Sequence, residues 1–336
     1  MARPVVAITM GDPAGIGPEV VLNALADSTV RGACCPLLLG DLAVLSRVRK
    51  GRRFPKLKSW EAGEPIGAGD GAIAVYSLSR LPAAKARPGR PSAACGEAAY
   101  RYIKRGAELV LSGVADALAT APINKSVLQL AGYRYPCHTE LLAELTRTRE
   151  CRMMLLGKRL KVILVTVHLP LMEVARELTS RKIRITLELA HQGLRNYFGI
   201  RRPRLAVAAL NPHAGEEGIF GREEKELIIP AIREAARKGI HAAGPFAADS
   251  LFHQAVGGEF DAVICMYHDQ GLIPLKLLHF TDGVQMTLGL PMIRTSVDHG
   301  TAYDIAGRGL ADPTSMKEAI LLATRLANRR SQGRRP

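Results

Sequence analysis

The sequence predicts an α/β protein of two domains with mainly parallel sheets, and three observations lead to this class. Short β-branched and aliphatic runs alternate with amphipathic segments along the chain, a pattern typical of βαβ units with parallel strands. The 336 residues, 47% hydrophobic and 23% charged, have the composition of a globular protein and exceed what one compact core usually holds. No run approaches about 18 consecutive apolar residues, which excludes a membrane-spanning helix.

The predicted elements follow in βαβ order from the N-terminus. Residues 4–9 predict a strand, and residues 15–19 open a helix with Pro18 in its first turn, where the N–H that proline lacks would have no partner anyway. Runs rich in Val, Ile, Leu and Ala predict further strands at residues 114–120, 161–167, 204–210 and 261–266. Helical hydrophobic spacing predicts helices near residues 95–112, 180–197, 222–238 and 314–328.

The cysteines and the N-terminus predict a cytoplasmic protein. Six cysteines are scattered without a CxxC pair: Cys34, Cys35, Cys95, Cys137, Cys151 and Cys265. In a chain of this length such cysteines are typical of reduced thiols and not of a disulfide framework. The N-terminal residues lead straight into the first predicted strand and lack the long apolar core of a signal peptide.

The formal net charge is +15, from 46 Lys and Arg against 31 Asp and Glu. An excess of this size raises the question of a nucleic-acid partner. Much of it lies in residues 47–58 and 325–335, and the aromatic side chains that would stack on single-stranded bases make up only 5% of the chain. We therefore expect solvated surface charge. A non-catalytic nucleic-acid-binding protein stays as an alternative. An affinity for nucleic acid that falls steeply with salt concentration would support that alternative.

Three predicted strands end in a histidine. His168 follows the strand at 161–167, His213 follows the strand at 204–210, and His268 follows the strand at 261–266. Ligands of open parallel sheets bind beyond the carboxyl ends of the strands, so the three imidazoles are expected at one edge. Three neutral imidazoles suit zinc, cobalt, nickel or iron and leave a coordination position open for substrate. Each histidine alone has a structural explanation, and only their shared placement indicates a metal site.

Two aspartates accompany these histidines. Asp269 directly follows His268, and Asp249 lies before the segment Ser250-Leu251-Phe252. A carboxylate beside a metal-binding histidine commonly orients the ring. Capping of a helix N-terminus explains either aspartate equally well.

Several side chains are candidates for holding an acidic substrate. His138 and Thr139 stand where a helix is expected to begin, and backbone N–H groups at such a position favour phosphate or carboxylate. Lys276 follows the His-Asp pair by a short helical span, and Arg294 lies in a stretch flanked by Gly and Pro. Helix capping and ordinary surface charge are the alternative interpretations.

Two glycine-rich segments are candidates for cofactor binding. Residues 11–17, GDPAGIG, follow a strand and precede a helix, but they are not GxGxxG, so a Rossmann site is weakly indicated. Residues 298–307, DHGTAYDIAG, resemble the adenosine-binding loop of isopropylmalate dehydrogenases, which bind NAD on a non-Rossmann α/β fold. That resemblance implies that the adenosine half of NAD or NADP is held by residues of this loop: Asp298, His299, Gly300, Thr301 and Asp304.

Taken together, the motifs resemble the PdxA family of 4-hydroxythreonine-4-phosphate dehydrogenases, over residues 5–326. The matching segments are GDPAGIGP at 11–18, HTE at 138–140, HLP at 168–170, NPHAGE at 211–216, YHDQG at 267–271 and RTSVDHGT at 294–301. The resemblance implies an isopropylmalate-dehydrogenase-like fold. One domain would comprise residues 1–130 and 300–336, and a second, residues 131–299, would carry the metal ligands and the dimer interface. The active site would lie in the cleft and be completed across a homodimer.

The resemblance also assigns roles to residues. His168, His213 and His268 match the family's ligands to a divalent metal, most often zinc, with magnesium, cobalt or manganese as alternatives. The substrate-binding residues of the family match His138, Thr139, Lys276 and Arg294. Lys276, or Asp249 acting through water, is the candidate base, and Asp269 is a further catalytic candidate through His268.

Two positions depart from the family pattern. Gln285 stands where the family usually has a substrate-binding Asn, and the extra methylene changes the reach of the amide by more than about 1 Å. Cys137 stands where Gly is common. Both favour the alternative of a paralogue for a four-carbon sugar-acid 4-phosphate or an aromatic cis-dihydrodiol, whereas residues 294–299 match the biosynthetic branch better.

The expected reaction is the NAD(P)-dependent oxidation and decarboxylation of 4-phosphohydroxy-L-threonine to 3-amino-2-oxopropyl phosphate and CO2, a step of pyridoxal 5'-phosphate biosynthesis. The metal would make the substrate alcohol more acidic and then polarise the ketone. The sequence does not distinguish NAD from NADP, since no acidic ribose-selecting residue can be placed.

Overall fold

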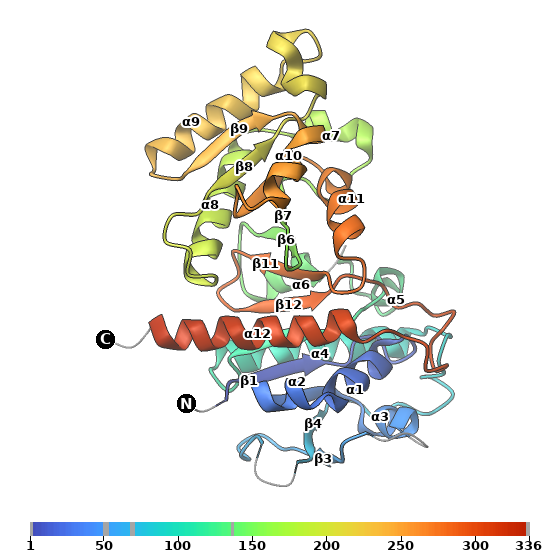
Figure 1. The fold of residues 1–336 in the computed structure, drawn as a ribbon. Helices are drawn as coiled ribbons and strands as arrows, with labels where there is room; N and C mark the ends of the chain where they lie inside the picture. Colours follow the sequence, from blue (N-terminus) through green and yellow to red (C-terminus); the bar gives the residue numbers. More distant parts are fainter. Residues whose placement is uncertain (1–2, 50–53, 68–70, 136–137, 334–336) are drawn as a thin grey trace. The chain divides into compact units, whose positions relative to one another are not determined.

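The computed structural model describes residues 3–49, 54–67, 71–135 and 138–333. The chain divides into two compact units (Figure 1). Unit 1 comprises Met1–Arg149 and Leu290–Pro336, and unit 2 comprises Glu150–Gly289. Two segments that the sequence assigned to the second domain, residues 131–149 and 290–299, lie in unit 1. Their packing explains this, because α6 (His138–Leu145) contacts α4 (Ala93–Leu111) and β12 (Arg294–Val297) pairs with β5 (Ala117–Thr120), all within unit 1.

Unit 1 contains a parallel sheet in the order β3-β4-β2-β1-β5-β12. Its remaining strands are β1 (Val5–Thr9), β2 (Cys35–Gly40), β3 (Leu57–Ser59) and β4 (Ile73–Ser77). The central strands β1 and β5 are buried almost throughout, as expected of parallel strands covered on both faces. The register places Thr9, Thr120 and Ser296 side by side at the carboxyl ends of β1, β5 and β12. Polar side chains therefore meet at this edge.

Helices cover both faces of this sheet, with α12 (Thr314–Gly333) in front and α4 behind in Figure 1. The other helices of the unit are α1 (Gly17–Ala26), α2 (Ser28–Ala33), α3 (Leu42–Arg49) and α5 (Lys125–Leu130). Ser92 caps α4 by accepting a hydrogen bond from the backbone N–H of Cys95. Gly106 lets α4 approach β5, since a Cβ there would lie 2.6 Å from Leu118 Cδ1.

Unit 2 contains a mixed, mostly parallel sheet in the order β11-β6-β7-β10-β8-β9. The strands are β6 (Arg152–Leu156), β7 (Lys161–Leu164), β8 (Leu205–Ala208), β9 (Ala242–Phe246), β10 (Ala262–Cys265) and β11 (Val284–Leu288). Strand β6 is antiparallel to both of its neighbours, whereas β7, β10, β8 and β9 run parallel. The carboxyl ends of these four strands therefore share one edge.

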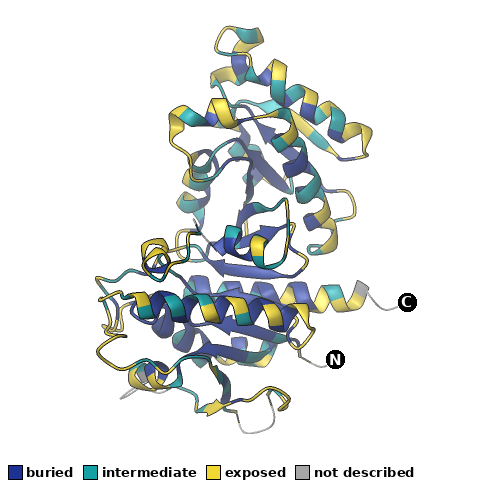
Figure 2. Ribbon diagram, turned by 180° about the vertical axis from the view of Figure 1, so that it is seen from behind, coloured by how far each residue is buried: buried dark blue, intermediate teal, exposed yellow. Residues whose placement is uncertain are grey.

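Five helices and two irregular helical turns connect the strands of unit 2. They are α7 (Leu171–Glu177), α8 (Ser180–Asn196), α9 (Ile229–Arg237), α10 (Ala248–Val256), α11 (His268–Leu278), the 3-10 turn η1 (Pro212–Gly218) and the π turn η2 (Glu224–Ile228). In Figure 2 the buried residues of this unit, as of unit 1, concentrate in the strands and on the helix faces turned toward them. None of the helices described is long and apolar enough to cross a membrane.

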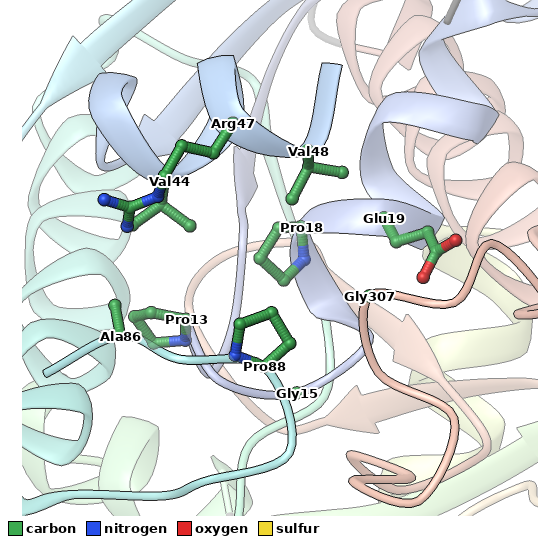
Figure 3. Close-up of a pocket in the computed structure, with 10 residues that line it drawn as sticks. All are labelled: Pro13, Gly15, Pro18, Glu19, Val44, Arg47, Val48, Ala86, Pro88 and Gly307. Carbon is green, nitrogen blue, oxygen red and sulfur yellow. The ribbon is translucent and has the colours of Figure 1, made fainter. Parts of the chain in front are cut away.

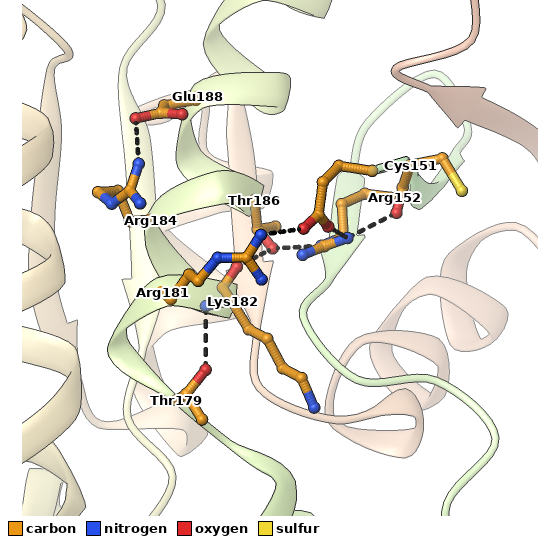
Figure 4. Close-up of polar contacts among 9 residues, drawn as sticks. Cys151, Arg152, Thr179, Arg181, Lys182, Arg184, Thr186 and Glu188 are labelled. Carbon is orange, nitrogen blue, oxygen red and sulfur yellow. Dashed lines mark hydrogen bonds and ion pairs between the residues drawn. The ribbon is translucent and has the colours of Figure 1, made fainter. Parts of the chain in front are cut away.

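Polar contacts connect β6 to α8 (Figure 4). Arg152 Nε donates to Thr186 Oγ1 over 2.8 Å, and Arg152 Nη1 lies 3.2 Å from Glu150 Oε2. Glu150 also pairs with Arg181 Nη2 of α8 at 2.7 Å. These contacts position the start of the antiparallel strand β6 against α8. Each partly exposed ion pair among them contributes only up to about 1 kcal/mol to stability.

Candidate functional site

The three strand-end histidines follow neighbouring parallel strands of unit 2. His168 comes after β7, His268 begins α11 after β10, and His213 lies in η1 after β8. The rings of His168 and His268 have centroids 5.7 Å apart. Two imidazoles on one tetrahedral zinc ion, with Zn–N bonds of about 2.0–2.1 Å, have centroids roughly 5 Å apart. This pair is therefore spaced as two ligands of one cation would be.

Asp269 orients the ring of His268. Its Oδ1 lies 2.7 Å from His268 Nδ1, so that nitrogen is engaged by a carboxylate and Nε2 is the atom left to ligate a metal. A carboxylate in this position also makes the imidazole a stronger ligand. The contact agrees with the orienting role that the sequence suggested for Asp269.

His213 is placed differently from the other two. Its backbone has φ 50°, in a turn where Ala214, Glu216 and Glu217 also have positive φ, and its ring centroid lies 6.1 Å from that of Phe220. Among the residues that the structure describes, no three His, Cys, Asp or Glu side chains are close enough to hold a metal ion. The structure thus brings two of the three predicted ligands together. The imidazole pair suits a divalent metal, and His213 as the third ligand stays a prediction.

Glu224 of η2 holds the segment that leads to His213. This carboxylate is 2% exposed and accepts hydrogen bonds from the backbone N–H groups of Leu210 and Asn211, each at 2.8 Å. It also accepts from Asn211 Nδ2 at 2.9 Å. The contacts fix the end of β8, and residues held in the left-handed region often mark functional turns. No local pattern pointed to Glu224, because its hydrogen-bond partners lie 13 and 14 positions away in the chain.

The remaining sequence candidates of unit 2 are dispersed over three elements. Lys276 lies on α11 with its Nζ 5.6 Å from the ring centroid of Phe280. Asp249 is exposed in the first turn of α10, a helix that packs against β8, β10 and η1. Gln285 lies on β11, opposite Leu155 of β6. The catalytic and substrate-binding roles of these three residues stay predictions.

Unit 1 contains a buried cation beside a buried imidazole. Arg294 is fully buried and donates from Nη2 to Thr120 Oγ1 over 2.8 Å. Burial and the charge of Arg294 hold the pKa of His138 well below its usual range, so this ring is neutral. In the part of the chain that the structure describes, His138 Nε2 is buried and has no hydrogen-bond partner. Buried polar atoms are seldom left unsatisfied.

This pair of residues can recognise an oxyanion that carries a hydroxyl. The guanidinium supplies charge-assisted hydrogen bonds to phosphate or carboxylate, and the neutral imidazole supplies a donor or an acceptor. Thr139, 6% exposed, follows His138 in the first turn of α6. The arrangement supports the predicted substrate-binding roles of His138, Thr139 and Arg294. Cys137, which precedes them, lies outside the described residues.

The glycine-rich segment at 11–17 and the loop at 298–307 pack against each other in unit 1. The N–H of Ile16 donates to the carbonyl of Thr301 over 2.9 Å. Gly15 permits this approach, because a Cβ there would lie 2.9 Å from Thr301 Cβ. The Tyr303 hydroxyl donates to Asp12 Oδ2 at 2.5 Å. Of the predicted cofactor residues, Thr301 is thus buried in this junction.

The other predicted cofactor residues are more accessible. His299, Gly300 and Asp304 are exposed, and the N–H of Asp298 donates to Ser315 Oγ over 3.1 Å. The loop therefore presents polar groups and backbone at the surface of unit 1, and its binding of a cofactor stays a prediction.

Asp12 and Tyr303 are functional candidates that the sequence did not single out. Asp12 is 1% exposed, and burial raises its pKa although hydrogen bonds from Tyr303 and from the N–H groups of Ala14 and Gly15 act in the opposite direction. Burial and the neighbouring Asp12 raise the pKa of the Tyr303 phenol as well. Both residues lie inside the quoted motifs, but their pairing across 291 positions is a tertiary contact.

A cavity of about 250 Å³ adjoins the junction of the two loops (Figure 3). Figure 3 shows prolines and valines on its walls and the charged side chains of Arg47 and Glu19 at its sides. The residues that line it are Pro13, Gly15, Pro18, Glu19, Val44, Arg47, Val48, Ala86, Pro88 and Gly307. Such a mainly apolar hollow beside a loop of exposed polar groups suits part of a planar organic ligand.

Comparison with known proteins gives consistent results across the chain. A sequence profile described as Pyridoxal phosphate biosynthetic protein PdxA matches residues 32–323. A 4-hydroxythreonine-4-phosphate dehydrogenase of Desulforapulum autotrophicum is 50% identical over 323 residues, covering 96% of this chain and 95% of the relative. A D-threonate 4-phosphate dehydrogenase of Cupriavidus necator is 46% identical over 331 residues, with 98% of each chain covered. The crystal structure of 4-hydroxythreonine-4-phosphate dehydrogenase from Klebsiella pneumoniae superposes with a TM-score of 0.88 at 42% identity, covering 97% of this chain and 100% of that one.

Proposed function

We propose that this chain, which belongs to the PdxA family of dehydrogenases, oxidises and decarboxylates 4-phosphohydroxy-L-threonine with NAD or NADP, in the biosynthesis of pyridoxal 5'-phosphate. The products are 3-amino-2-oxopropyl phosphate, CO2 and NAD(P)H. The observation that carries the proposal is the neutral, buried His138 beside the fully buried cation of Arg294. A phosphorylated hydroxy-amino acid offers both an oxyanion and hydroxyl groups to such a pair.

Arg294, His138 and Thr139 hold the substrate in this proposal. The guanidinium binds an oxyanion of the substrate, and its orientation is fixed by the bond to Thr120 Oγ1. His138 stays neutral through the working pH range because its pKa is lowered by burial and by Arg294. It can therefore donate to or accept from a substrate oxygen without adding charge. Lys276 and Gln285 of unit 2 are assigned to the same substrate on the family pattern.

His168, His268 and His213 are proposed to hold a divalent metal, with zinc as the first candidate and magnesium, cobalt or manganese as alternatives. When bound, the cation supplies Lewis acidity toward the substrate hydroxyl and later toward the ketone. Two observations support this assignment. The ring centroids of His168 and His268 lie 5.7 Å apart, and Asp269 Oδ1 lies 2.7 Å from His268 Nδ1. Lys276, or Asp249 through a water molecule, takes the hydroxyl proton.

The loop at 298–304 is proposed to hold the adenosine half of NAD or NADP. When bound, the dinucleotide would supply the acceptor for a hydride from the alcohol carbon, and the candidate base would take the hydroxyl proton. Loss of CO2 from the resulting β-keto acid would leave the electron pair of the broken C–C bond in an enolate, which is then protonated at the carbon that carried the carboxylate. Thr301 and Tyr303 support the loop through their bonds to the glycine-rich segment.

We further propose a cytoplasmic homodimer that shares its active sites, with no nucleic-acid partner. Large apolar side chains exposed on unit 2 support an interface there: Leu171 (70%) and Met172 (79%) on α7, and Ile273 (67%), Leu277 (85%) and Phe280 (77%) on or next to α11. Exposed apolar side chains in such numbers commonly belong to an interaction surface.

A second substrate has a specific observation in its favour. The relative from Cupriavidus necator acts on D-threonate 4-phosphate, by its name, and Gln285 departs from the asparagine that the family usually has. D-threonate 4-phosphate lacks the amino group, so a longer amide at position 285 has a different set of groups to contact.

The experiment is a comparison of turnover with the two substrates. Purified protein supplied with zinc, magnesium or cobalt is assayed for NADH and NADPH formation with 4-phosphohydroxy-L-threonine and with D-threonate 4-phosphate. The proposal predicts a higher kcat/KM for the amino acid. A higher value for the threonate assigns the alternative, and no NAD(P)H from either substrate with any metal would refute the proposed activity.

A further inference from the structure

A second hollow, in unit 2, is lined by basic side chains. Its volume is about 630 Å³, and it lies between the C-terminal ends of α8 and α9 and the start of β9. The lining residues are His191, Arg195, Arg201, Arg202, Ala236, Lys238, Gly239, Ile240, His241 and Ala242. None of these residues belongs to the candidate site described above.

The topology places this hollow at the opposite edge of the sheet from the histidines. Arg201 and Arg202 precede β8, and Ile240 and His241 precede β9, so all four lie at the amino ends of these parallel strands. The strand-end histidines follow the carboxyl ends of β7, β10 and β8. A ligand in the basic hollow would therefore not occupy the site of the proposed reaction.

The positive charge in the hollow is not neutralised by nearby carboxylates. Within the described parts of the chain, no acidic side chain forms an ion pair with Arg195, Arg201 or Arg202. Lys238 is the exception, because its Nζ lies 2.7 Å from Glu188 Oε1. The ends of α8 and α9 contribute about −0.5 charge each. Three unpaired arginines against two helix ends leave an excess of roughly two positive charges.

His191 adds an unsatisfied polar atom to the same wall. Its Nδ1 is buried and has no hydrogen-bond partner among the described residues. Burial and the charge of Arg195 lower the pKa of this ring, so it is neutral near pH 7 and able to donate one hydrogen bond. The neutral imidazole can donate a hydrogen bond to a ligand oxygen. It does so without adding a positive charge to those of the neighbouring arginines.

We propose that this hollow binds a linear oligophosphate, of the class of pyrophosphate, triphosphate or the phosphate chain of a nucleotide. Each guanidinium can contact two phosphate oxygens at once, and several arginines around one hollow match several linked phosphates better than a single one. The volume is that of a small-molecule site. A site of this kind on the edge remote from the histidines is placed to regulate the enzyme and not to take part in its chemistry.

Isothermal titration calorimetry of the 336-residue chain with inorganic triphosphate at about 0.15 M salt tests the proposal. The double variant Arg201→Ala/Arg202→Ala is expected to bind at least about tenfold more weakly, since it removes two guanidinium groups that would donate charge-assisted hydrogen bonds to phosphate. The matched control is Arg176→Ala/Arg181→Ala, which removes the same charge from exposed positions of unit 2 outside the hollow. It should bind triphosphate as the wild type does.

Three results would overturn the proposal. They are no measurable binding of triphosphate by the wild type, equal weakening by the control variant, and tighter binding of duplex DNA or RNA with the same dependence on Arg201 and Arg202. Circular dichroism of both variants establishes that they are folded. The binding measurement needs no substrate, so it succeeds or fails independently of the proposed dehydrogenase activity.

Discussion

Replacing Tyr303 by Phe is expected to weaken the junction between the loop at 298–307 and the glycine-rich segment. The Tyr303 hydroxyl donates to Asp12 Oδ2 at 2.5 Å, and Asp12 is 1% exposed, so water cannot easily take the place of the lost hydroxyl. A hydrogen bond to a charged acceptor contributes about 1.5–3 kcal/mol, and one between neutral groups contributes about 1 kcal/mol. We therefore expect Tyr303→Phe to lower the free energy of unfolding by about 1.5–3 kcal/mol where Asp12 is ionised and by about 1 kcal/mol where it is protonated.

The sign of the pH dependence follows from the pKa of Asp12. Burial raises this pKa, and the Tyr303 hydroxyl offsets part of the rise, so the variant should have a still higher pKa at Asp12. A carboxyl group whose pKa is raised in the folded state stabilises the fold below its unfolded pKa, about 4, and loses that contribution as the pH rises through the folded pKa. The deficit of the variant relative to the wild type should therefore grow from acidic pH toward neutrality.

Urea unfolding at several pH values measures this effect. Trp60, the single tryptophan of the chain, is 4% exposed in unit 1, so its fluorescence reports the unfolding of the unit that contains both loops. The matched control is Tyr135→Phe, which removes a hydroxyl that donates to Glu144 at an exposed position. The reasoning is refuted if Tyr303→Phe is no less stable than the control, or if its deficit is the same at acidic and neutral pH.

Three further substitutions test the proposed roles of single residues. Arg294→Gln should lower kcat/KM by about a hundredfold or more, because the buried cation for the substrate is lost; an unchanged value would exclude Arg294 from substrate binding. Asp269→Asn should weaken zinc affinity by about 10- to 100-fold, as measured by competition with a chelator, since His268 loses its orienting carboxylate. If the variant bound zinc as tightly as the wild type, Asp269 would not be the group that orients the His268 ring. Gln285→Asn should shift the ratio of kcat/KM values toward 4-phosphohydroxy-L-threonine over D-threonate 4-phosphate by about tenfold, and an unchanged ratio would mean that position 285 does not select the substrate.

The long periodic elements were predictable from the sequence because their pattern is local. The strands predicted at 161–167 and 261–266 correspond to β7 and β10, and the helix predicted at 180–197 corresponds to α8. Strands β2, β4, β9, β11 and β12 were not predicted, and the same holds for a further pair, β3 and β6. The first has only three residues at the edge of its sheet, and the second is an antiparallel strand whose place is fixed by contacts of Arg152 with residues up to 34 positions away.

The candidate site was predictable where a motif carries its own chemistry. The pairing of His268 with Asp269 joins adjacent residues, and the helix start at His138 is a local signal. The contact of Arg294 with Thr120 spans 174 positions, and that of Tyr303 with Asp12 spans 291. Contacts of this kind depend on strand order, which hydrophobic periodicity does not encode. The basic hollow at the amino ends of β8 and β9 was not predicted from the sequence for the same reason, because it depends on the pairing of these two strands.

The most direct measurement for the central claim is the joint yield of CO2 and NAD(P)H from 4-phosphohydroxy-L-threonine labelled in its carboxyl group. We expect the two products in equal amounts, loss of both after the metal is removed with a chelator, and recovery on adding zinc or another divalent cation. Reduced cofactor without labelled CO2, or full turnover by the metal-depleted protein, would contradict the mechanism.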